Sequence, residues 1–134
     1  MIGFIGGTGP EGRGLALRFA AAGEQVLIGS RDQARARDAA ASVLALSPDS
    51  SVAAGANLDV ARRADIVFVM VPYVAHRQVL QSAGDTLTGK VVVDVVASVA
   101  VSDGVARTVP VADGSAAQEA QAVLPNSSVA AAFQ

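Results

Sequence analysis

The sequence predicts an α/β protein with a parallel sheet at its centre. Short apolar segments alternate with longer alanine-rich segments of helical character along the 134 residues. This pattern requires parallel strands that are joined by right-handed crossover helices. Hydrophobic residues make up 51% of the chain and its mean hydropathy is +0.44, as suits a sheet that is covered on both faces. Residues 1–134 are therefore expected to form one domain with a core of its own.

A glycine-rich turn separates the first expected strand, within residues 1–5, from the first expected helix. Gly7, Gly9 and Gly12 match the pattern G-x-G-x-x-G in the context that it demands, after a strand and before a helix. Because they lack a Cβ, Gly7 can make the tight turn, Gly9 lets a pyrophosphate approach, and Gly12 lets the helix pack on the strand. The anion would lie on the free N–H groups at the positive end of the helix. The pattern predicts dinucleotide binding in a Rossmann fold rather than an ordinary strand-to-helix turn.

The end of the second expected strand indicates which dinucleotide binds. NAD-binding domains carry an acid there that accepts from the adenosine ribose 2′-OH, whereas this chain has Ser30 and Arg31, followed by Arg35. A hydroxyl and two guanidinium groups can hold a 2′-phosphate, so the sequence favours NADP over NAD. The alternative is that the arginines form the solvated face of a helix together with Asp32 and Asp38. NADP is the favoured interpretation because Arg31 stands at the ribose position itself.

The rest of the chain completes the alternation of strands and helices. Further strands are expected at residues 25–28, 52–54, 65–71, 90–96 and 129–133. Further helices are expected at residues 32–46, 58–64, 73–83 and 115–124, with Asn57 and Ser115 as N-caps. Residues 97–113 show no helical period and contain Gly104 and Pro110, so a loop that shapes a site is expected there. Six strands fit the doubly wound order 3-2-1-4-5-6 with helices on both faces, and the ligand would lie over the carboxyl ends of strands one and four.

Composition and charge exclude several other classes of protein. The formal net charge of −2 and the 4% content of aromatic residues provide no basic stripe and no stacking platform, so no nucleic-acid partner is expected. The chain has no cysteine, which excludes a disulfide scaffold and a thiolate nucleophile. No signal peptide and no apolar run of membrane-spanning length is found, so a cytoplasmic protein without membrane contact is expected. No side-chain spacing suits a metal site.

The polar residues near the expected cleft include few candidates for proton transfer. His76 is the only histidine and lies near the place where a nicotinamide would rest, so one interpretation gives it a proton role. The favoured interpretation is a solvated helix position, because no partner carboxylate is near it in sequence. Asp94 interrupts the fifth expected strand and is expected to hold the following loop by hydrogen bonds. No residue is therefore assigned a catalytic role.

Three segments resemble the N-terminal part of a known enzyme family. IGGTG at residues 5–9, GRGLALR at residues 12–18 and GSR at residues 29–31 look like the start of the NADPH-dependent coenzyme F420 reductases, which are deazaflavin-linked NADP oxidoreductases. The resemblance extends through residues 65–67, 71–72, 89–94, 114–117 and 130–133, and so covers nearly the whole chain. It implies hydride transfer between NADP(H) and coenzyme F420 as co-substrate, in a protein that forms a homodimer.

The resemblance also implies which residues hold NADP. The family binds the pyrophosphate with the glycine turn, the 2′-phosphate with side chains after the second strand, and the rest of NADP with residues after the fourth and fifth strands. The expected cofactor-binding residues are Gly7, Thr8, Gly9, Pro10, Glu11, Gly12, Ser30, Arg31, Arg35, Pro72, Tyr73, Arg77 and Val99. The expected catalytic set is empty, because both cofactors carry the reactivity themselves.

The chain departs from the family at two places. Residues 95–99 read VVASV where members often have Asn-Pro or a proline-rich turn. Members also continue past the sixth strand into a helical segment that closes over the cofactors and forms the dimer, so residues 1–134 are expected to be the NADP-binding domain without that segment. Two alternatives stay open. One is an NADP-binding module or fragment without catalysis, and the other is a different NADP-dependent reductase of similar fold that acts on an imine or a keto acid.

Overall fold

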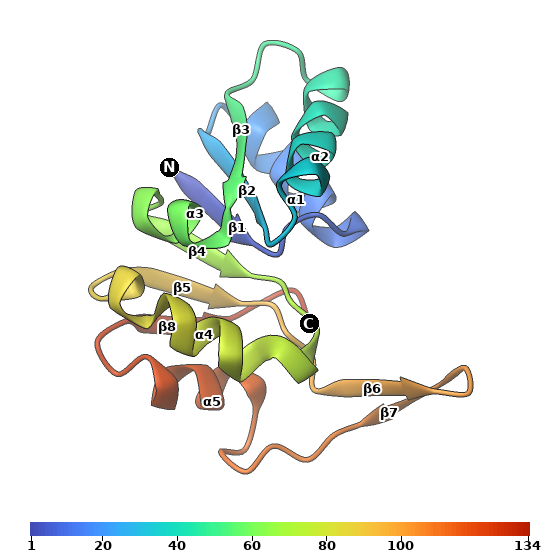
Figure 1. The fold of residues 1–134 in the computed structure, drawn as a ribbon, viewed down its shortest axis with the longest axis vertical. Helices are drawn as coiled ribbons and strands as arrows, with labels where there is room; N and C mark the ends of the chain where they lie inside the picture. The colour runs from blue at the N-terminus through green and yellow to red at the C-terminus, as the bar shows by residue number, and fades with distance from the viewer.

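A six-stranded parallel sheet forms the centre of the protein in the computed structural model, which describes residues 1–134 (Figure 1). The strands stand in the order β3-β2-β1-β4-β5-β8, and every neighbouring pair is parallel. They are β1 (Ile2–Ile5), β2 (Val26–Ser30), β3 (Val52–Ala56), β4 (Ile66–Val69), β5 (Val91–Asp94) and β8 (Ser128–Ala131). The helices are α1 (Pro10–Ala21), α2 (Gln33–Leu46), α3 (Asn57–Arg63), α4 (Tyr73–Leu87) and α5 (Ala116–Val123). The predicted doubly wound order 3-2-1-4-5-6 is confirmed, with β8 as its sixth strand.

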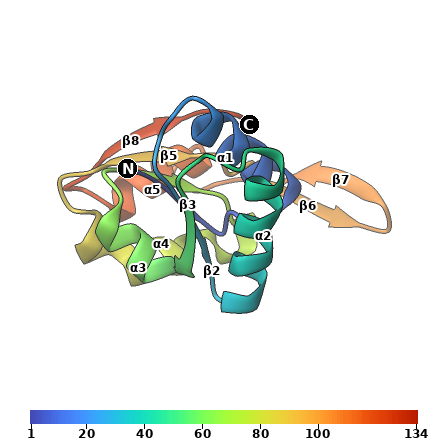
Figure 2. The same cartoon turned by 90° about the horizontal axis from the view of Figure 1, so that it is seen from above.

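The helices cover the sheet as two layers, with α1 and α2 on one face and α3, α4 and α5 on the other (Figure 1, Figure 2). Alternate residues of a strand point to opposite faces. Phe4 and Phe68 therefore pack with the first layer, and their rings stack with centroids 5.1 Å apart. Ile5 and Val67 pack with the second layer. The sheet is buried on both faces, as the hydropathy of the chain predicts. None of the helices has the length and apolar character needed to cross a membrane.

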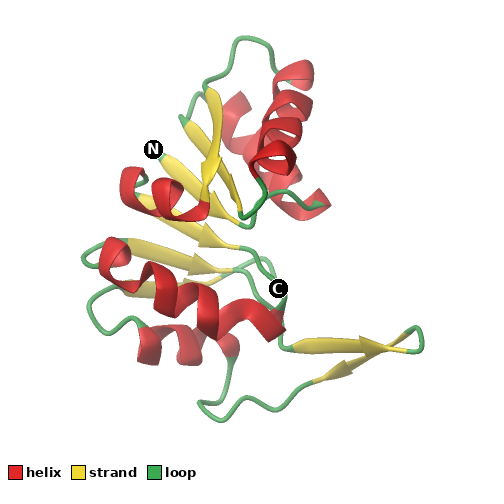
Figure 3. Ribbon diagram, in the orientation of Figure 1, coloured by secondary structure: helices red, strands yellow, loops and turns green.

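Residues 97–113 contain a two-stranded antiparallel hairpin, β6 (Val99–Ser102) and β7 (Val105–Thr108). The hairpin extends away from the rest of the domain, as Figure 3 shows, and all of its strand residues are exposed. Asp103 and Gly104 form its two-residue turn with φ of 53° and 75°, and a type I′ turn requires positive φ at both positions. The prediction of a loop is wrong, because an Asp-Gly pair between two strand-forming segments is itself a hairpin signal.

The predicted N-cap is found at α5 but not at α3. Ser115 caps α5, since its Oγ accepts a hydrogen bond from the N–H of Gln118 at 3.2 Å. Asn57 is not the N-cap of α3, because the helix begins at Asn57 itself and its Oδ1 accepts from the N–H of Gly6 at 3.1 Å. The predicted cap is therefore wrong, and the side chain instead joins α3 to the glycine turn.

Lys90 joins the start of β5 to the end of α3. Its Nζ donates to the carbonyl oxygens of Ala61, Arg62 and Ala64 at 2.6, 2.8 and 2.7 Å. The last carbonyl groups of a helix have no partner inside the helix and carry partial negative charge, so a cation is favourable there. Both ends of α3 are therefore tied to other elements, one by Lys90 and the other by Asn57.

Candidate functional site

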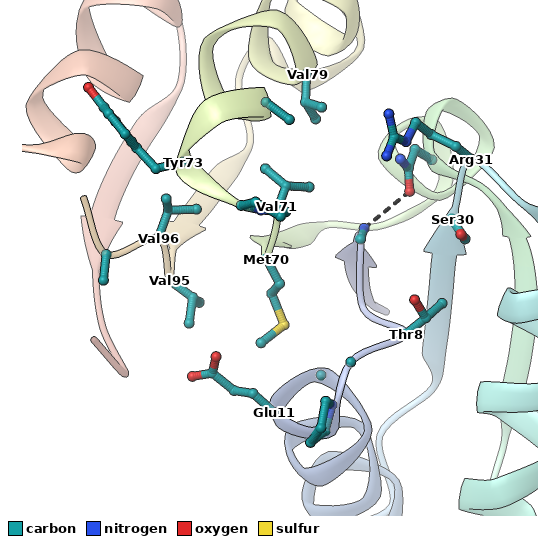
Figure 4. A pocket seen from close by; sticks show the side chains of 18 of the residues that line it. Thr8, Glu11, Ser30, Arg31, Met70, Val71, Tyr73, Val79, Val95 and Val96 are labelled. Atoms are coloured by element: carbon teal, nitrogen blue, oxygen red, sulfur yellow. Dashed lines mark hydrogen bonds between the residues drawn. The ribbon is translucent and has the colours of Figure 1, made fainter. Parts of the chain in front are cut away.

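The carboxyl ends of β1, β2, β4 and β5 surround a cavity of about 960 Å³ (Figure 4). The strand order reverses between β1 and β4, which is where a doubly wound sheet opens for a ligand. The lining residues are Gly6, Thr8, Gly9, Pro10, Glu11, Gly12, Ser30, Arg31, Asp32, Arg35, Asn57, Met70, Val71, Pro72, Tyr73, Ala75, Val79, Val95, Val96, Ala97, Val99, Phe133 and Gln134. All of the predicted cofactor-binding residues except Gly7 and Arg77 are among them.

The backbone of the glycine turn leaves open space on the cavity side. Gly6, rather than Gly7, takes the left-handed conformation, with φ of 74°, so the predicted role of Gly7 in the tight turn passes to Gly6. A Cβ on Gly12 would lie 2.5 Å from the carbonyl oxygen of Gly7, so the close contact that Gly12 allows is between α1 and the glycine turn, whereas the glycine pattern predicts a contact with the first strand. A Cβ on Gly9 would meet no atom within 4 Å. The space over Gly9 is therefore free for a ligand.

The first turn of α1 offers donors to this space. The N-cap is Gly9, which has no side chain to accept from the N–H groups of the helix, and Pro10 follows it. The N–H groups of Glu11 and Gly12 have no partner inside the helix, and the helix dipole adds partial positive charge there. Figure 4 shows the Glu11 side chain extending from α1 to the side of the cavity where Val95 lies. This helix end can hold an anion over Gly9.

The carboxyl end of β2 carries a second set of groups that suits an anion. Ser30 is 8% exposed, and its Oγ accepts from the N–H of Asp32 at 3.1 Å, which leaves its O–H free to donate. Arg31 and Arg35 are exposed and form no ion pair with an acidic residue. Asp32 was not expected in the site. It caps α2, since its Oδ1 accepts from the N–H groups of Ala34 and Arg35 at 2.9 and 3.3 Å.

The wall opposite these two anion sites is apolar. It consists of Met70 and Val71 from the connection between β4 and α4, Tyr73 at the start of α4, and Val95 and Val96 from the segment after β5 (Figure 4). Val95 and Val96 are buried, and Tyr73 is half-buried. A wall of this kind sheds water and can take the face of a planar ring.

Behind this wall, and not in the cavity lining, His76 is buried between two carboxylates. Its Nδ1 lies 2.9 Å from Oε1 of Glu119 and its Nε2 lies 3.2 Å from Oδ1 of Asp94. Arg77 pairs with Glu119 at 3.0 Å and with Asp113 at 2.8 Å. The prediction that His76 is solvated is wrong, because α4 turns this side chain toward β5 and α5. Its partners are 18 and 43 positions away in the sequence, so no local pattern revealed them.

The two carboxylates favour a charged His76. Burial by itself lowers the pKa of His76, but the hydrogen bonds and attraction of Asp94 and Glu119 outweigh it and raise that pKa. Burial by itself raises the pKa of Glu119, but the hydrogen bonds of His76 and Arg77 outweigh it and lower that pKa. Asp94 also accepts from the N–H of Val96 at 3.2 Å, as predicted for a residue that holds the following loop. The cluster therefore supports the apolar wall from behind.

A comparison of sequences identifies the family. The profile of the family described as NADP oxidoreductase, coenzyme F420-dependent, matches residues 1–98. The chain belongs to this family. The part of the chain that matches this coenzyme F420-dependent family includes the glycine turn, the Ser30 segment and the apolar wall as far as Val96.

Individual relatives extend the match over almost the whole chain. The chain is 42% identical to the F420-dependent NADP reductase of Methanothermobacter thermautotrophicus, over 98% of this chain and 60% of the relative. It is 38% identical to the reductase of Methanothermobacter marburgensis, over 98% of this chain and 62% of the relative. It is 34% identical to the F420-dependent NADP reductase of Methanocaldococcus jannaschii, over 99% of this chain and 62% of the relative. The chain thus spans about 60% of the length of the curated relatives it matches.

Solved structures of distant proteins share the fold. Lactate dehydrogenase from Eimeria maxima, solved with NADH and oxamate, superposes with a TM-score of 0.63 at 10% identity, over 98% of this chain and 42% of that chain. Pyrroline carboxylate reductase from Plasmodium falciparum, solved with NADP, superposes with a TM-score of 0.54 at 20% identity, over 72% of this chain and 33% of that chain. At these identities the likeness shows the fold alone, and it confirms the predicted Rossmann fold.

Proposed function

We propose that the cavity binds NADP(H). The observation that carries this proposal is that one cavity brings together two different sets of groups suited to bind an anion, the N-terminus of α1 and the side chains of Ser30, Arg31 and Arg35. The pyrophosphate lies over Gly9 at the N-terminus of α1, and the 2′-phosphate lies between Ser30 and the unpaired guanidinium groups of Arg31 and Arg35. Oδ1 of Asp32 accepts hydrogen bonds from two N–H groups of α2, so this carboxylate caps the helix, and the groups that stand before it at the end of β2 are Ser30 and Arg31.

The remaining predicted residues enter this proposal in two ways. Thr8, Pro10, Glu11, Gly12, Pro72, Tyr73 and Val99 line the cavity and contact the dinucleotide. Gly7 lets the turn lie close to β1, since a Cβ on it would lie only 2.5 Å from Cβ of Phe4. Arg77 supports the wall through its bonds to Glu119 and Asp113.

We propose further that the whole protein transfers hydride between NADP(H) and coenzyme F420, as the names of its relatives indicate. NADPH, when bound, would supply a hydride from nicotinamide C4 to C5 of the deazaflavin, and a proton from the solvent would complete the reduced deazaflavin. The task of the chain is to position the nicotinamide and exclude water. Val71, Tyr73 and Val95 form the wall for this purpose. A homodimer of the whole protein and a cytoplasmic location stay predictions.

Two measurements test these proposals separately. Calorimetry should show that NADP⁺ binds at least about tenfold more tightly than NAD⁺. This is the effect of one charge-assisted hydrogen bond to the 2′-phosphate, which NAD⁺ lacks. The absorbance of oxidised coenzyme F420 should fall when NADPH is added with the whole protein. Equal binding of the two nucleotides would contradict the first proposal. NADP binding without reduction of the deazaflavin would instead favour a nucleotide-binding module.

A further inference from the structure

Asn57 stands between the glycine turn and the carboxyl end of β2. It is the first residue of α3 and is half-buried. Its side chain lines the main cavity and also a second cavity of about 400 Å³, and Ser30 and Arg31 line both cavities as well. Asn57 is therefore placed at the adenosine end of the proposed NADP site, beside the groups proposed for the 2′-phosphate.

The hydrogen bond to the glycine turn fixes which way the amide of Asn57 faces. The N–H of Gly6 can only donate, so the amide atom 3.1 Å from it must be the oxygen. The dashed line in Figure 4 marks this bond. The NH₂ group of the same amide has no hydrogen-bond partner in the protein, and it is not a buried atom. Two N–H donors are therefore available at the wall that the two cavities share.

The neighbouring strand leaves room for this side chain. A Cβ on Gly29 would lie 2.8 Å from Oδ1 of Asn57 and 2.8 Å from the carbonyl oxygen of Phe4. Real side chains do not approach this closely, so any residue other than glycine at position 29 would displace Asn57. The Gly29-Ser30 pair thus serves two purposes, because one residue admits Asn57 and the other faces the proposed phosphate.

We propose that Asn57 binds the adenosine half of the dinucleotide and positions the glycine turn at the same time. Its Oδ1 holds Gly6, and its NH₂ group donates to an acceptor atom of the adenosine half. This inference rests on the proposed NADP site. It adds a contact from α3 to a site that otherwise draws its anion-binding groups from the glycine turn, β2 and α2.

The substitution Asn57→Asp separates the two roles. Aspartate keeps an oxygen for the N–H of Gly6 but replaces the NH₂ donors with a second, negatively charged oxygen. We expect NADP⁺ and 2′,5′-ADP to bind at least about tenfold more weakly in calorimetry, while the melting temperature without nucleotide stays near that of the unmutated chain. Asn126→Asp is the matched control, because it adds the same charge at an exposed residue whose side chain makes no hydrogen bond. It should bind like the unmutated chain.

Nuclear magnetic resonance of the unmutated chain gives an independent measurement. The side-chain amide signals of Asn57, assigned by their loss in Asn57→Ala, should shift when 2′,5′-ADP saturates the site, and those of Asn126 should not. The inference is overturned if Asn57→Asp binds NADP⁺ as tightly as the unmutated chain does. It is also overturned if the amide signals of Asn57 do not shift when 2′,5′-ADP binds. If Asn57→Asp does not fold, the amide signals decide alone. Absence of NADP⁺ binding by the unmutated chain would overturn the NADP proposal and this inference with it, so the two failures can be told apart.

Discussion

Nδ1 of His76 lies 2.9 Å from Oε1 of Glu119, although the two residues are 43 positions apart. The contact joins the first turns of α4 to α5, and Nε2 of the same ring reaches Asp94 at the end of β5. One imidazole therefore holds together three elements behind the apolar wall of the cavity. Because this imidazole does not line the cavity, we expect it to stabilise the wall and to take no part in the proposed hydride transfer.

Substitution of His76 should destabilise the fold. His76→Gln leaves the buried carboxylate of Asp94 without a cation and leaves Glu119 with Arg77 alone, and breaking a buried ion pair in this way costs roughly 3–5 kcal/mol. We expect the free energy of unfolding in urea to fall by at least roughly 3 kcal/mol. Arg62→Gln is the control, since it breaks an exposed pair with Asp59 and should cost less than about 1 kcal/mol. If His76→Gln also lowers the free energy of unfolding by less than about 1 kcal/mol, the buried cluster contributes little to the stability of the fold.

The stability of the unmutated chain should depend on pH through the same cluster. The pKa of His76 is raised in the folded state, so its contribution is complete below its unfolded pKa of about 6.5 and is lost as the pH rises through the folded pKa. The pKa of Glu119 is lowered, so its contribution is present above its unfolded pKa and is lost as the pH falls through the folded pKa. Urea denaturation at several pH values should show the alkaline decline in the unmutated chain and a weaker decline in His76→Gln. Parallel pH profiles would contradict the assignment.

Removal of Arg31 should cost NADP affinity and leave NAD affinity unchanged. One charge-assisted hydrogen bond to a phosphate is worth roughly 1.5–3 kcal/mol, so Arg31→Ala should weaken NADP⁺ binding by about tenfold to a hundredfold. Arg37→Ala is the matched control, because Arg37 lies in α2 shortly after Arg31, is exposed, bonds to Gln33 and lies outside the cavity lining. Calorimetry with both nucleotides measures the difference. An equal loss of NAD⁺ binding would show that Arg31 does not contact the 2′-phosphate.

Valine at two glycines of the turn should separate binding from folding. Gly9 has φ of −75° and open space where a Cβ would lie, so Gly9→Val should fold normally and lose nucleotide binding. Gly12→Val should also destabilise the chain by roughly 1–3 kcal/mol, because its Cβ would overlap the backbone of Gly7. Gly14→Val is the control, since Gly14 is exposed, outside the cavity and free of close neighbours. Normal NADP⁺ binding by Gly9→Val would mean that the turn is only structural.

The sheet could be predicted from the sequence because its information is local. Each strand is a short apolar segment next to a turn, and the alternation with helices fixes the parallel order. The hairpin at β6 and β7 also has a local signal, Asp103-Gly104, but the absence of a helical period in residues 97–113 favours a loop. β6 and β7 are exposed, so their sequences lack the hydrophobic pattern by which the other strands are predicted. The turn residues are the one signal that predicts them.

The parts of the site that depend on long-range contacts could not be predicted. The glycine turn and the Ser30 segment are continuous motifs, and the structure places them in one cavity. Asn57, in contrast, meets Gly6 across 51 positions, and a residue at the start of a helix is ordinarily assigned to a cap. His76 was misassigned for the same reason, since both of its partners come from other elements. In both cases the decisive atom belongs to a neighbour that only the folded sheet brings near.

Lys90 is the only lysine in the chain, and three carbonyl oxygens at the end of α3 surround its Nζ. The ammonium group must leave these oxygens before an acylating reagent can reach it. The N-terminal amine of Met1, which is paired only with the exposed Asp65, is the more accessible amine. The rate at which Lys90 is acylated therefore measures how often its ammonium group leaves the end of α3, the helix whose other end holds the glycine turn.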